Sequence, residues 1–510
     1  MTKAFADILR DLAGRQPGAP ALTCGEDTWT FADLHARSAR TAQALRAEGV
    51  GPGDRVGVLS RNCNEFFELI FACNMLGAIM VGLNWRLSSF EIEAIVEDAK
   101  PVVIIAGAMQ EGDLLSETAR GTDGLRRILT IGGDYERWRS DAPAEDPGHR
   151  GQPDEVALIL YTSGTTGLPK GVMLTNRGMS YSQRLAAEIW GMTSASVNLV
   201  AMPMFHIGGC GYGTSTLLVG GHTVLMRDVN LPQVIRLIEM QRVTHAFFVP
   251  TVVQGLLEVP GVETADLSSL KLLMYGASPI GESLLRKALT ILSCDFMQAY
   301  GMTETSGTVV NLMPDEHRLD GSGTDRLRSC GRALPFVEIR ITDPVTLNEA
   351  ETGTVGEIWV RSEMVMPGYW QNPAATADAI MPGGWLRTGD AAYRDADGFI
   401  YLYDRFKDMI ISGGENIYPA EIENVLLSHP AVSEIAVIGI PHARWVETPR
   451  AIVVLRTGMT TTERELIDFA RSRLAHYKCP TSVLFADMLP RNASGKLLKR
   501  ELRKTYRPSG

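Results

Sequence analysis

The residues between Tyr161 and Gly171 carry the clearest chemistry in this chain, in the run Tyr-Thr-Ser-Gly-Thr-Thr-Gly-Leu-Pro-Lys-Gly. Glycines let backbone N–H groups approach phosphate oxygens, hydroxyls donate hydrogen bonds to them, and an ammonium group neutralises their charge. The apolar run 156–160 predicts a strand that ends at this loop. The spacing is not that of a P-loop, and a plain Gly/Thr turn is the alternative interpretation. The candidate phosphate contacts are Thr162, Ser163, Gly164, Thr165, Thr166, Gly167 and Lys170.

Length and composition favour a multidomain globular enzyme. The chain has 510 residues, 45% hydrophobic and 21% charged, which is too long for one core and ordinary in balance. Its net charge is −10, and it has no run of five or more basic residues. These features argue against nucleic acid as the main partner and against nonspecific binding to anionic membranes.

Cysteine usage and apolar patterning predict a cytoplasmic protein. The seven cysteines never form a Cys-x-x-Cys pair, which favours free thiols in a reducing compartment. The N-terminus predicts a short amphipathic helix and lacks the apolar core of a signal peptide. The longest apolar run, 66–83, is broken by Glu68 and Asn74, so we expect a buried helix and strand there and no integral membrane segment. Peripheral membrane contact stays open.

Short β-rich runs alternate with amphipathic stretches through most of the chain, which predicts an α/β fold with parallel sheets. From about residue 329 the pattern changes to alternating strands. A compact αβ pattern of about 100 residues follows, which fits a small separate domain. There we expect helices at 419–428 and 463–474 and strands at 435–438 and 451–454. The segment 141–154 is predicted to be a surface connector.

Seven further motifs follow the phosphate loop in a fixed order. They are Met202–His206, Tyr275–Pro279, Tyr300–Glu304, Leu386–Asp390, Tyr403–Asp408, Ser412–Glu423 and Pro490–Lys496. Together with the loop, this set closely resembles the acyl-CoA and aryl-CoA synthetases of the adenylate-forming (ANL) superfamily. The resemblance implies a large N-terminal domain of packed αβ sheets with a β-rich lobe (1–403), a hinge (404–408) and a small mobile α+β C-terminal domain (409–510).

The resemblance also assigns roles in adenylation, in which a carboxylate attacks the α-phosphorus of ATP. Such a step depends mostly on positioning and charge neutralisation. Glu304 resembles the family's Mg²⁺-binding glutamate, and Lys496 its catalytic lysine, which bridges the carboxylate and the α-phosphate. Read alone, Lys496 would be a solvated lysine. The remaining expected ATP and AMP contacts are Gly276, Ala277, Tyr300, Gly301, Thr303, Asp390 and Arg405.

Thioester formation with coenzyme A would follow a swing of the C-terminal domain. The resemblance places the pivot at Lys407, counted as catalytic. The predicted coenzyme A contacts are Ser412, Gly413, Gly414, Trp445, Tyr477 and Lys478. Cys479 and Thr481 stand where some aryl-CoA relatives carry basic residues, so this part of the pattern departs from theirs.

The acid is the least specified ligand. His206 resembles the aromatic gate between acid and pantetheine, with a core histidine and a proton acceptor as alternatives. Gly208, Gly209 and Gly211 carry no bulk, and no Lys or Arg lies in the surrounding motifs to pair a second carboxylate. We therefore expect a mostly apolar acid, either a medium- or long-chain fatty acid or a bulky alicyclic one. A cinnamate- or benzoate-type aryl acid is the alternative, and the glycines could equally shape tight turns.

The sequence thus predicts an AMP-forming acyl-CoA ligase that uses ATP, Mg²⁺ and coenzyme A. An acyl-AMP ligase that loads a carrier protein and a luciferase-like oxygenase share the adenylation chemistry. A nucleotide-binding regulatory protein without turnover would be expected to lack Lys496 or Glu304, and both are present. A homodimer stays open.

Overall fold

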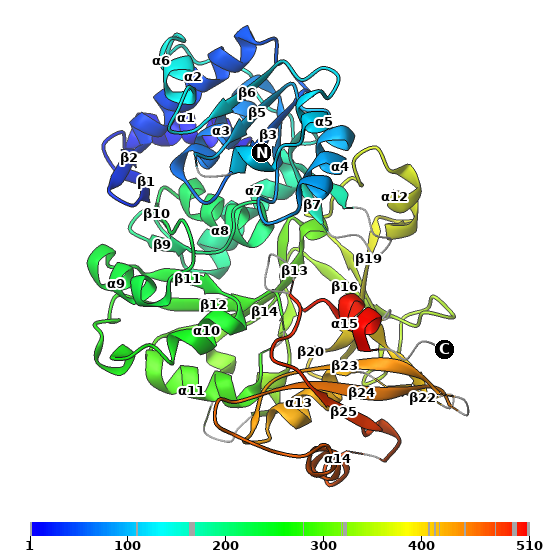
Figure 1. Cartoon of the computed structure of the whole chain (residues 1–510). Coiled ribbons are helices and arrows are strands. Elements are labelled where there is room, and N and C mark those ends of the chain that lie inside the picture. The colour runs from blue at the N-terminus through cyan, green and yellow to red at the C-terminus, as the bar shows by residue number, and fades with distance from the viewer. Residues whose placement is uncertain are drawn as a thin grey trace. The chain divides into compact units, whose positions relative to one another are not determined.

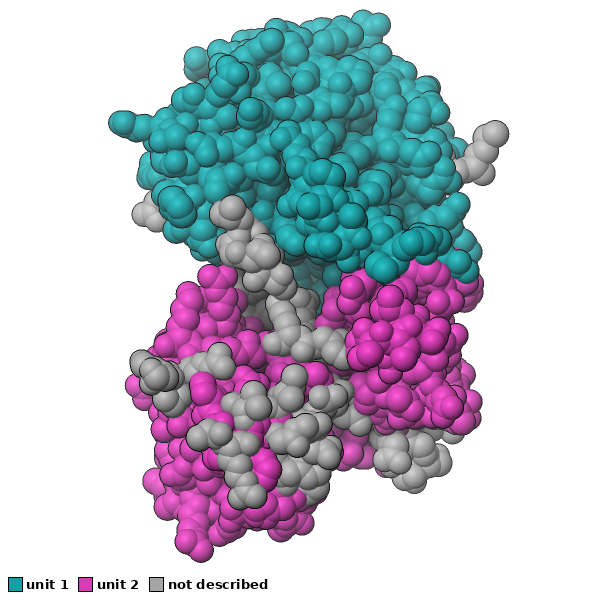
Figure 2. Space-filling view, turned by 90° about the vertical axis from the view of Figure 1, so that its right-hand side faces the viewer, with its two compact units in different colours: residues 1–277, 289–309, 361–384 teal, residues 278–288, 310–360, 385–510 magenta. Residues whose placement is uncertain are grey.

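The computed structural model describes residues 3–506 apart from 109–110, 163–168, 279, 318, 320–323, 406–407, 413–414, 418, 443–444, 475 and 492–496. Its contacts divide the chain into two compact units, coloured separately in Figure 2. Unit 1 comprises residues 1–277, 289–309 and 361–384, and unit 2 comprises 278–288, 310–360 and 385–510. The predicted hinge at 404–408 falls within unit 2 by this division, and the predicted domain boundaries stay a prediction.

Unit 1 contains a six-stranded sheet in the order β6-β5-β3-β4-β7-β8 (Figure 1). All its pairs are parallel except β7–β8. Strands β4 and β5 are buried at every position, as expected for a sheet covered on both faces. The strands are β3 (Arg55–Leu59), β4 (Ile79–Gly82), β5 (Val103–Ala106), β6 (Arg127–Thr130), β7 (Val156–Thr162) and β8 (Lys170–Thr175). The α-helices of this part are α1 (Phe5–Arg15), α2 (Phe31–Ala47), α3 (Asn64–Leu76), α4 (Ser89–Ala99), α5 (Glu117–Arg120) and α6 (Tyr135–Ser140).

A second sheet of unit 1 runs in the order β13-β12-β11-β9-β10-β1-β2. Its pairs are parallel except β1–β2. The strands are β1 (Pro20–Cys24), β2 (Asp27–Thr30), β9 (Val197–Val200), β10 (His222–Leu225), β11 (His245–Phe248), β12 (Leu272–Gly276) and β13 (Asp295–Met302). The other elements of unit 1 are α7 (Asn176–Arg184), a π-helix (Leu185–Ile189), α8 (Ile207–Leu218), α9 (Leu231–Gln241), α10 (Pro250–Leu256), α12 (Pro373–Ala379) and β18 (Ile380–Met381). Helix α11 (Glu282–Leu292) and strand β14 (Gly307–Leu312) each pass from one unit to the other.

Unit 2 holds two groups of strands. In the first, β17 lies between β16 and β19, β20 pairs with β19, and β15 pairs with the end of β14. In the second, the order is β22-β21-β24-β23, and β25 pairs with β24. The bounds are β15 (Arg332–Ala333), β16 (Glu338–Thr342), β17 (Gly356–Arg361), β19 (Trp385–Arg394), β20 (Ile400–Arg405), β21 (Ile410–Ser412), β22 (Glu415–Ile417), β23 (Val432–His442), β24 (Val446–Leu455), β25 (Ser482–Phe485), α13 (Pro419–Leu427), α14 (Glu463–Arg471) and α15 (Lys499–Tyr506).

The predicted α/β fold class is therefore confirmed, and most local predictions hold. Elements α13, β23, β24 and α14 include the predicted ranges or overlap them. Strands β23 and β24 extend beyond the predicted 435–438 and 451–454 at both ends, and α14 ends three residues earlier than predicted. The apolar run 66–83 forms most of helix α3 and all of strand β4, which confirms the buried helix and strand predicted there. In the part of the chain that is described, no helix is both long and apolar enough to cross a bilayer.

Helix starts follow the capping rules. Thr30 caps α2 by accepting a hydrogen bond from the Asp33 N–H, while the Asp33 carboxylate accepts one from the Thr30 N–H. Ser88 and Glu91 form the same reciprocal pair at the start of α4. Such boxes satisfy two of the N–H groups that a helix leaves unpaired at its start.

Glu68 explains why a charged residue interrupts an apolar helix. Its carboxylate is fully buried and accepts hydrogen bonds from Arg37 (3.0 Å), Tyr135 (2.7 Å) and Thr41. Arg139 lies 3.4 Å from the same carboxylate. Because these partners come from α2 and α6, the buried charge ties both helices to α3. A buried charge is tolerated only when it is paired in this way.

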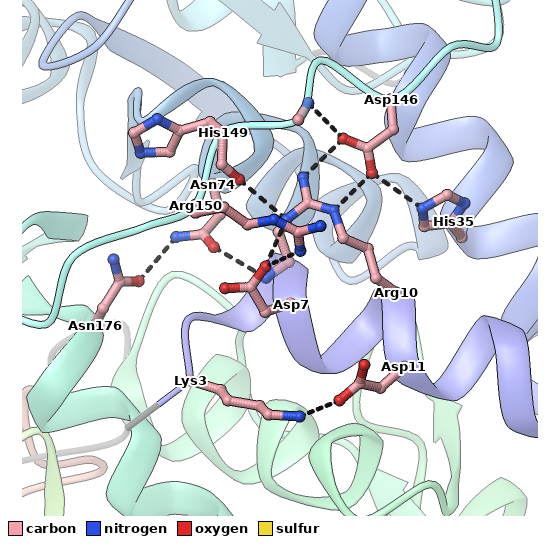
Figure 3. Close-up of polar contacts among 12 residues, drawn as sticks. Lys3, Asp7, Arg10, Asp11, His35, Asn74, Asp146, His149, Arg150 and Asn176 are labelled. Atoms are coloured by element: carbon pink, nitrogen blue, oxygen red, sulfur yellow. Dashed lines mark hydrogen bonds and ion pairs between the residues drawn. The ribbon is translucent and has the colours of Figure 1, made fainter. Parts of the chain in front are cut away.

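The predicted connector 141–154 is fastened to α1 and α2 by Asp146 (Figure 3). The Asp146 carboxylate accepts two hydrogen bonds from Arg10, both 2.7 Å, and one from the Gly148 N–H at 2.8 Å. His35 lies 3.1 Å from it. Burial alone would raise the pKa of Asp146, but the hydrogen bonds from Arg10 and Gly148 outweigh burial and lower it to about 2.

We expect Asp146→Asn to lower the free energy of unfolding by about 1–2 kcal/mol at pH 7, allowing for partial solvent exposure. A carboxyl whose pKa falls on folding stabilises the fold above its unfolded pKa of 3.8. That contribution is lost as the pH falls from about 4 through about 2. Urea unfolding of both proteins between pH 7 and pH 2 should therefore show a difference that disappears at low pH.

Asp154→Asn is the matched control, because Asp154 also pairs with an arginine but its side chain is 83% exposed. We expect it to change stability by less than about 0.5 kcal/mol. If Asp146→Asn is no more destabilising than this control, the connector is not held by Asp146.

Candidate active site

The phosphate loop of the sequence prediction sits between β7 and β8. Strand β7 ends at Thr162 and β8 begins at Lys170, and these two residues face each other across the antiparallel pair. The strand predicted before the loop is thus confirmed. Ser163, Gly164, Thr165, Thr166 and Gly167 lie outside the described residues, as do Lys407, Gly413, Gly414 and Lys496, so their roles stay predictions.

A strap formed by residues 364–370 runs along the free edge of β8. The Trp370 N–H donates to the Gly171 carbonyl at 2.7 Å, and the Met173 N–H donates to the Gly368 carbonyl at 3.2 Å. A bridge joins Val172 to Tyr369. The strap therefore hydrogen-bonds to the edge strand β8 next to Lys170, and it fixes the position of the residues at which β8 begins.

Glu304 is held on the other side of the same strap. Its side chain is only 7% exposed, and its Oε1 accepts a hydrogen bond from the Tyr369 hydroxyl at 3.0 Å. The Glu304 carbonyl accepts from the Met366 N–H at 2.8 Å. Ser306, two residues on, donates to the Met364 carbonyl at 2.7 Å. Backbone and side chain of Glu304 are thus both positioned by residues 364–369.

Tyr369 contacts both Lys170 and Glu304, and the sequence did not predict it as a site residue. Its ring lies 5.1 Å from the Lys170 ammonium, in a cation–π arrangement, while its hydroxyl binds Glu304. The available signal was weak: Tyr369 follows Pro367-Gly368, a turn dipeptide, and the predicted motifs skip this stretch. Three residues separated by up to 199 positions (170 to 369) form one polar cluster, which only the folded chain reveals.

The predicted adenine and α-phosphate residues gather at the carboxyl ends of β12 and β13. Gly276 ends β12, while Tyr300 and Gly301 lie near the end of β13, followed by Thr303 in a short 3₁₀ helix. Ligands of parallel α/β sheets commonly bind outside such strand ends. The structure brings these residues together, and their nucleotide contacts stay predictions.

Backbone crowding explains the glycines at these strand ends. A Cβ on Gly276 would lie 2.2 Å from the Ala299 carbonyl oxygen, and one on Gly301 would lie 2.0 Å from the Gly307 carbonyl oxygen. Neither position can carry a side chain without moving backbone. Ala277 adopts a left-handed conformation (φ 64°), which is strained for a residue with a side chain. Such strain tends to collect at ligand sites.

His206 lies half-buried just before α8, packed on Phe205 with ring centroids 4.6 Å apart. Among the described residues its Nε2 has no hydrogen-bond partner. Burial, and then the positive charge of Arg86, lower the pKa of His206 to about 4. The imidazole is therefore neutral at pH 7. A neutral ring suits a gate, and it is a weak proton acceptor for a thiol.

Three aromatic rings, which we call the ring row, extend from the strand ends past the predicted acid residues. Phe247 lies 3.4 Å from where a Cβ on Gly276 would be and 3.2 Å from where one on Gly208 would be. Tyr212 packs on Phe247 with centroids 5.7 Å apart, and Trp190 packs on Tyr212 at 5.4 Å. The row extends from Gly276, a predicted nucleotide contact, to the interior beside α8.

The three glycines predicted to line the acid have different reasons to be small. A Cβ on Gly209 would lie 2.2 Å from the Pro203 carbonyl oxygen, so the backbone requires glycine there whatever the ligand. At Gly208 and Gly211 the nearest atoms belong to the side chains of Phe247 and Ile207. Backbone does not force glycine at these two positions, but a Cβ would lie 3.2 Å from the Phe247 ring at Gly208 and 2.9 Å from the Ile207 side chain at Gly211. Their role in acid binding stays a prediction.

The remaining predicted residues belong to unit 2. Asp390 faces Arg405 across the β19–β20 pair, and its N–H donates to the Thr388 hydroxyl at 3.1 Å. Ser412 ends β21 opposite Glu415 and Val446. Trp445 is 41% exposed. The side chains of Arg405 and Tyr477 lie outside the described part.

Lys478 already has a partner within unit 2. Its ammonium lies 2.7 and 2.8 Å from the two carboxylate oxygens of Glu421. A phosphate of coenzyme A would have to share or replace that carboxylate. The predicted contact with coenzyme A therefore requires the Lys478 ammonium to exchange the Glu421 carboxylate for a phosphate group.

The donor chemistry of unit 1 fits the metal that the sequence predicts. A carboxylate oxygen, as on Glu304, is the hard ligand that Mg²⁺ prefers, and the ion usually completes its shell with phosphate oxygens and water. When bound, the ion would neutralise charge that builds on the phosphates. Tyr369 keeps the Glu304 carboxylate oriented, because its hydroxyl donates to Oε1.

Comparison with known proteins identifies the family. The family model described as "AMP-binding enzyme" matches residues 9–370, and the one described as "AMP-binding enzyme C-terminal domain" matches residues 421–496. A feruloyl-CoA synthase from a Streptomyces species is 38% identical over 97% of both chains. A fatty acid–[acyl-carrier-protein] ligase from Streptomyces coeruleorubidus is also 38% identical, over 97% of this chain and 95% of its own.

Solved structures extend the match to the fold. The o-succinylbenzoate CoA synthetase of Bacillus subtilis, in complex with its acyl-adenylate intermediate, has a TM-score of 0.87 and 33% identity, with 99% of both chains covered. The resemblance inferred from the motifs is thereby confirmed. The chain belongs to the AMP-binding enzyme family within the adenylate-forming ANL superfamily, as an AMP-forming CoA ligase that uses ATP, Mg²⁺ and coenzyme A.

Proposed function

We propose that this enzyme joins an aromatic carboxylic acid, of the cinnamate or benzoate class, to coenzyme A through an acyl-AMP intermediate. The ring row carries this proposal. Aromatic side chains favour offset or edge-to-face contact with another ring, which an aryl acid supplies. Phe247 lies beside Gly208, Tyr212 packs on Phe247, and Trp190 packs on Tyr212. We therefore favour an aryl acid over the fatty or alicyclic acid that the sequence alone favours.

A fatty acid is the second candidate. Gly208 and Gly211 carry no side chain that would obstruct an alkyl chain, and one 38%-identical relative is named a fatty acid–[acyl-carrier-protein] ligase. That name also keeps a carrier protein open as the thiol acceptor. A cytoplasmic location agrees with the use of ATP and coenzyme A.

Within this function, the strap prepares the adenylation site. The Tyr369 hydroxyl orients Glu304, and its ring face stabilises the Lys170 ammonium. Lys170 would hold phosphate oxygens while Lys496 bridges the acid and the α-phosphate. Because phosphoryl and nucleotidyl transfer depend on positioning, small displacements of these groups should cost rate. The domain boundaries 1–403, 404–408 and 409–510 and the pivot Lys407 belong to the same proposal.

We expect Tyr369→Phe to lower the rate of adenylation by about 10- to 100-fold, because it removes a hydrogen bond to a charged group worth about 1.5–3 kcal/mol. The substituted ring still lies over Lys170. ATP–pyrophosphate exchange, measured over a range of Mg²⁺ concentrations, should show a raised requirement for Mg²⁺. Tyr181→Phe is the matched control, because Tyr181 also donates to a glutamate, Glu363, at 2.8 Å. Equal effects of the two changes would remove Tyr369 from the adenylation site.

Lys496→Ala should abolish acyl-AMP formation while sparing the second half-reaction. The lysine is expected to act only on the carboxylate and the α-phosphate, so supplied acyl-AMP and coenzyme A should still give thioester. Single-turnover assays of each half-reaction measure the difference. A comparable loss in both would mean that Lys496 supports the fold or both steps.

The acid class is tested by kcat/KM for a panel of benzoates, cinnamates and straight-chain acids of 6 to 18 carbons, with coenzyme A as acceptor. We expect at least one aryl acid to exceed every straight-chain acid by about tenfold, the equivalent of 1.4 kcal/mol of ring packing. An optimum at a straight-chain acid would select the fatty-acid candidate.

A further inference from the structure

Two polar groups inside the ring row have no hydrogen-bond partner among the described residues. They are the indole N–H of Trp190 and the hydroxyl of Tyr212. Both side chains are more than nine-tenths buried, at 6% and 5% exposure. Buried polar groups are nearly always paired, and leaving one unpaired is costly. The Trp190 and Tyr212 rings that carry these two groups are neighbours, with ring centroids 5.4 Å apart. We call the two groups orphans.

The same two residues are otherwise firmly paired. The Trp190 carbonyl lies 3.1 Å from His245 Nε2, and the Tyr212 carbonyl accepts from the Asn198 amide at 3.4 Å. Burial lowers the pKa of His245 to about 4, so the imidazole is neutral and can donate from only one nitrogen. Their backbones are therefore fixed while their polar side-chain ends lack partners.

The chemistry of the two orphans defines what they can bind. An indole N–H only donates, and a phenol hydroxyl donates or accepts, so each of the two groups can donate to an oxygen atom. Burial raises the pKa of Tyr212, and no neighbouring charge contributes to that shift. The hydroxyl therefore stays protonated in an uncharged environment, which suits a neutral oxygen and disfavours a second carboxylate.

Position connects the orphans to the acid. Tyr212 lies on α8 one residue after Gly211 and packs on Phe247, which in turn lies beside Gly208 and Gly276. An acid whose carboxyl group reacts near Gly276 and whose ring packs along Phe247 would direct its far end toward Tyr212 and Trp190. An alkyl or unsubstituted aryl end would leave both polar groups unpaired.

We propose that Trp190 and Tyr212 form a subsite for a neutral oxygen substituent, a hydroxyl or an alkoxy group, on the ring of the aromatic acid. This inference rests on the proposed function and narrows the acid to an aromatic acid with an oxygen substituent on its ring. Specificity of this kind can be large, because a site with buried polar groups rejects an analogue that lacks the matching group. A difference in the size of the substituent alone discriminates between two acids much less.

The test compares kcat/KM for matched acids that differ only at the ring: hydroxyl, methoxy, methyl and hydrogen, at the 3- and 4-positions of cinnamate and benzoate. For the wild-type enzyme we expect the best hydroxy or methoxy acid to exceed its methyl counterpart at least tenfold. Tyr212→Phe keeps the ring and removes the hydroxyl, so it should lower that ratio at least fivefold. Trp190→Phe should act in the same direction.

Each other outcome has a distinct meaning. If aryl acids are used but the hydroxyl-to-methyl ratio is near one, or is unchanged in Tyr212→Phe, the subsite is overturned while the proposed function stands. The two groups would then be satisfied by internal water. A uniform loss on all acids in Tyr212→Phe, with Tyr181→Phe normal, would assign Tyr212 a structural role and also overturn the subsite. If no aryl acid is used, the proposed function itself fails.

Discussion

The free edge of strand β8 is the constraint on which the adenylation site depends. Because β7 and β8 form an antiparallel pair at the end of an otherwise parallel sheet, β8 exposes unpaired N–H and carbonyl groups on one side. The strap fills that edge through Gly171 and Met173. The same residues then reach Glu304 and Lys170. A single set of backbone hydrogen bonds thus sets the distance between the predicted metal-binding carboxylate, Glu304, and the predicted phosphate-binding ammonium, Lys170.

The rest of the site follows a similar logic, in which backbone geometry fixes chemistry. Strands β12 and β13 approach so closely at their ends that Gly276 and Gly301 admit no side chain. This leaves main-chain groups at the strand ends, where a nucleotide can lie against them. Ser306 adopts a left-handed conformation (φ 53°) and is held there by its bond to the Met364 carbonyl. The strap therefore also stabilises the turn that follows Glu304.

Sequence patterns were sufficient for the fold class, for most element positions and for the family, because periodicity and ordered motifs are local properties. The strand before the phosphate loop and elements α13, β23 and β24 were all predictable in this way. Tyr369 was not, because its contacts with Lys170 and Glu304 depend on where distant segments meet. The lowered pKa of His206 and the orphaned groups of Trp190 and Tyr212 depend on burial, which a motif does not encode. Gly209 shows that a motif can also suggest the wrong reason for a residue. The sequence predicted that this glycine makes room for substrate, but the nearby Pro203 carbonyl requires a glycine there in any case.

The strap has a consequence for how the chain acquires its structure during synthesis. The indole N–H of Trp370 donates to the Asp98 carbonyl at 3.3 Å, across 272 positions of sequence. Unit 1 is therefore incomplete until residues 361–384 have left the ribosome, although its first 277 residues are made much earlier. At translation rates of about 5–20 residues per second, the roughly 190 residues between β8 and the strap take about 10–40 s to appear. Throughout that interval the nascent chain carries an open sheet edge, the kind of surface that chaperones shield and that truncated chains keep permanently exposed.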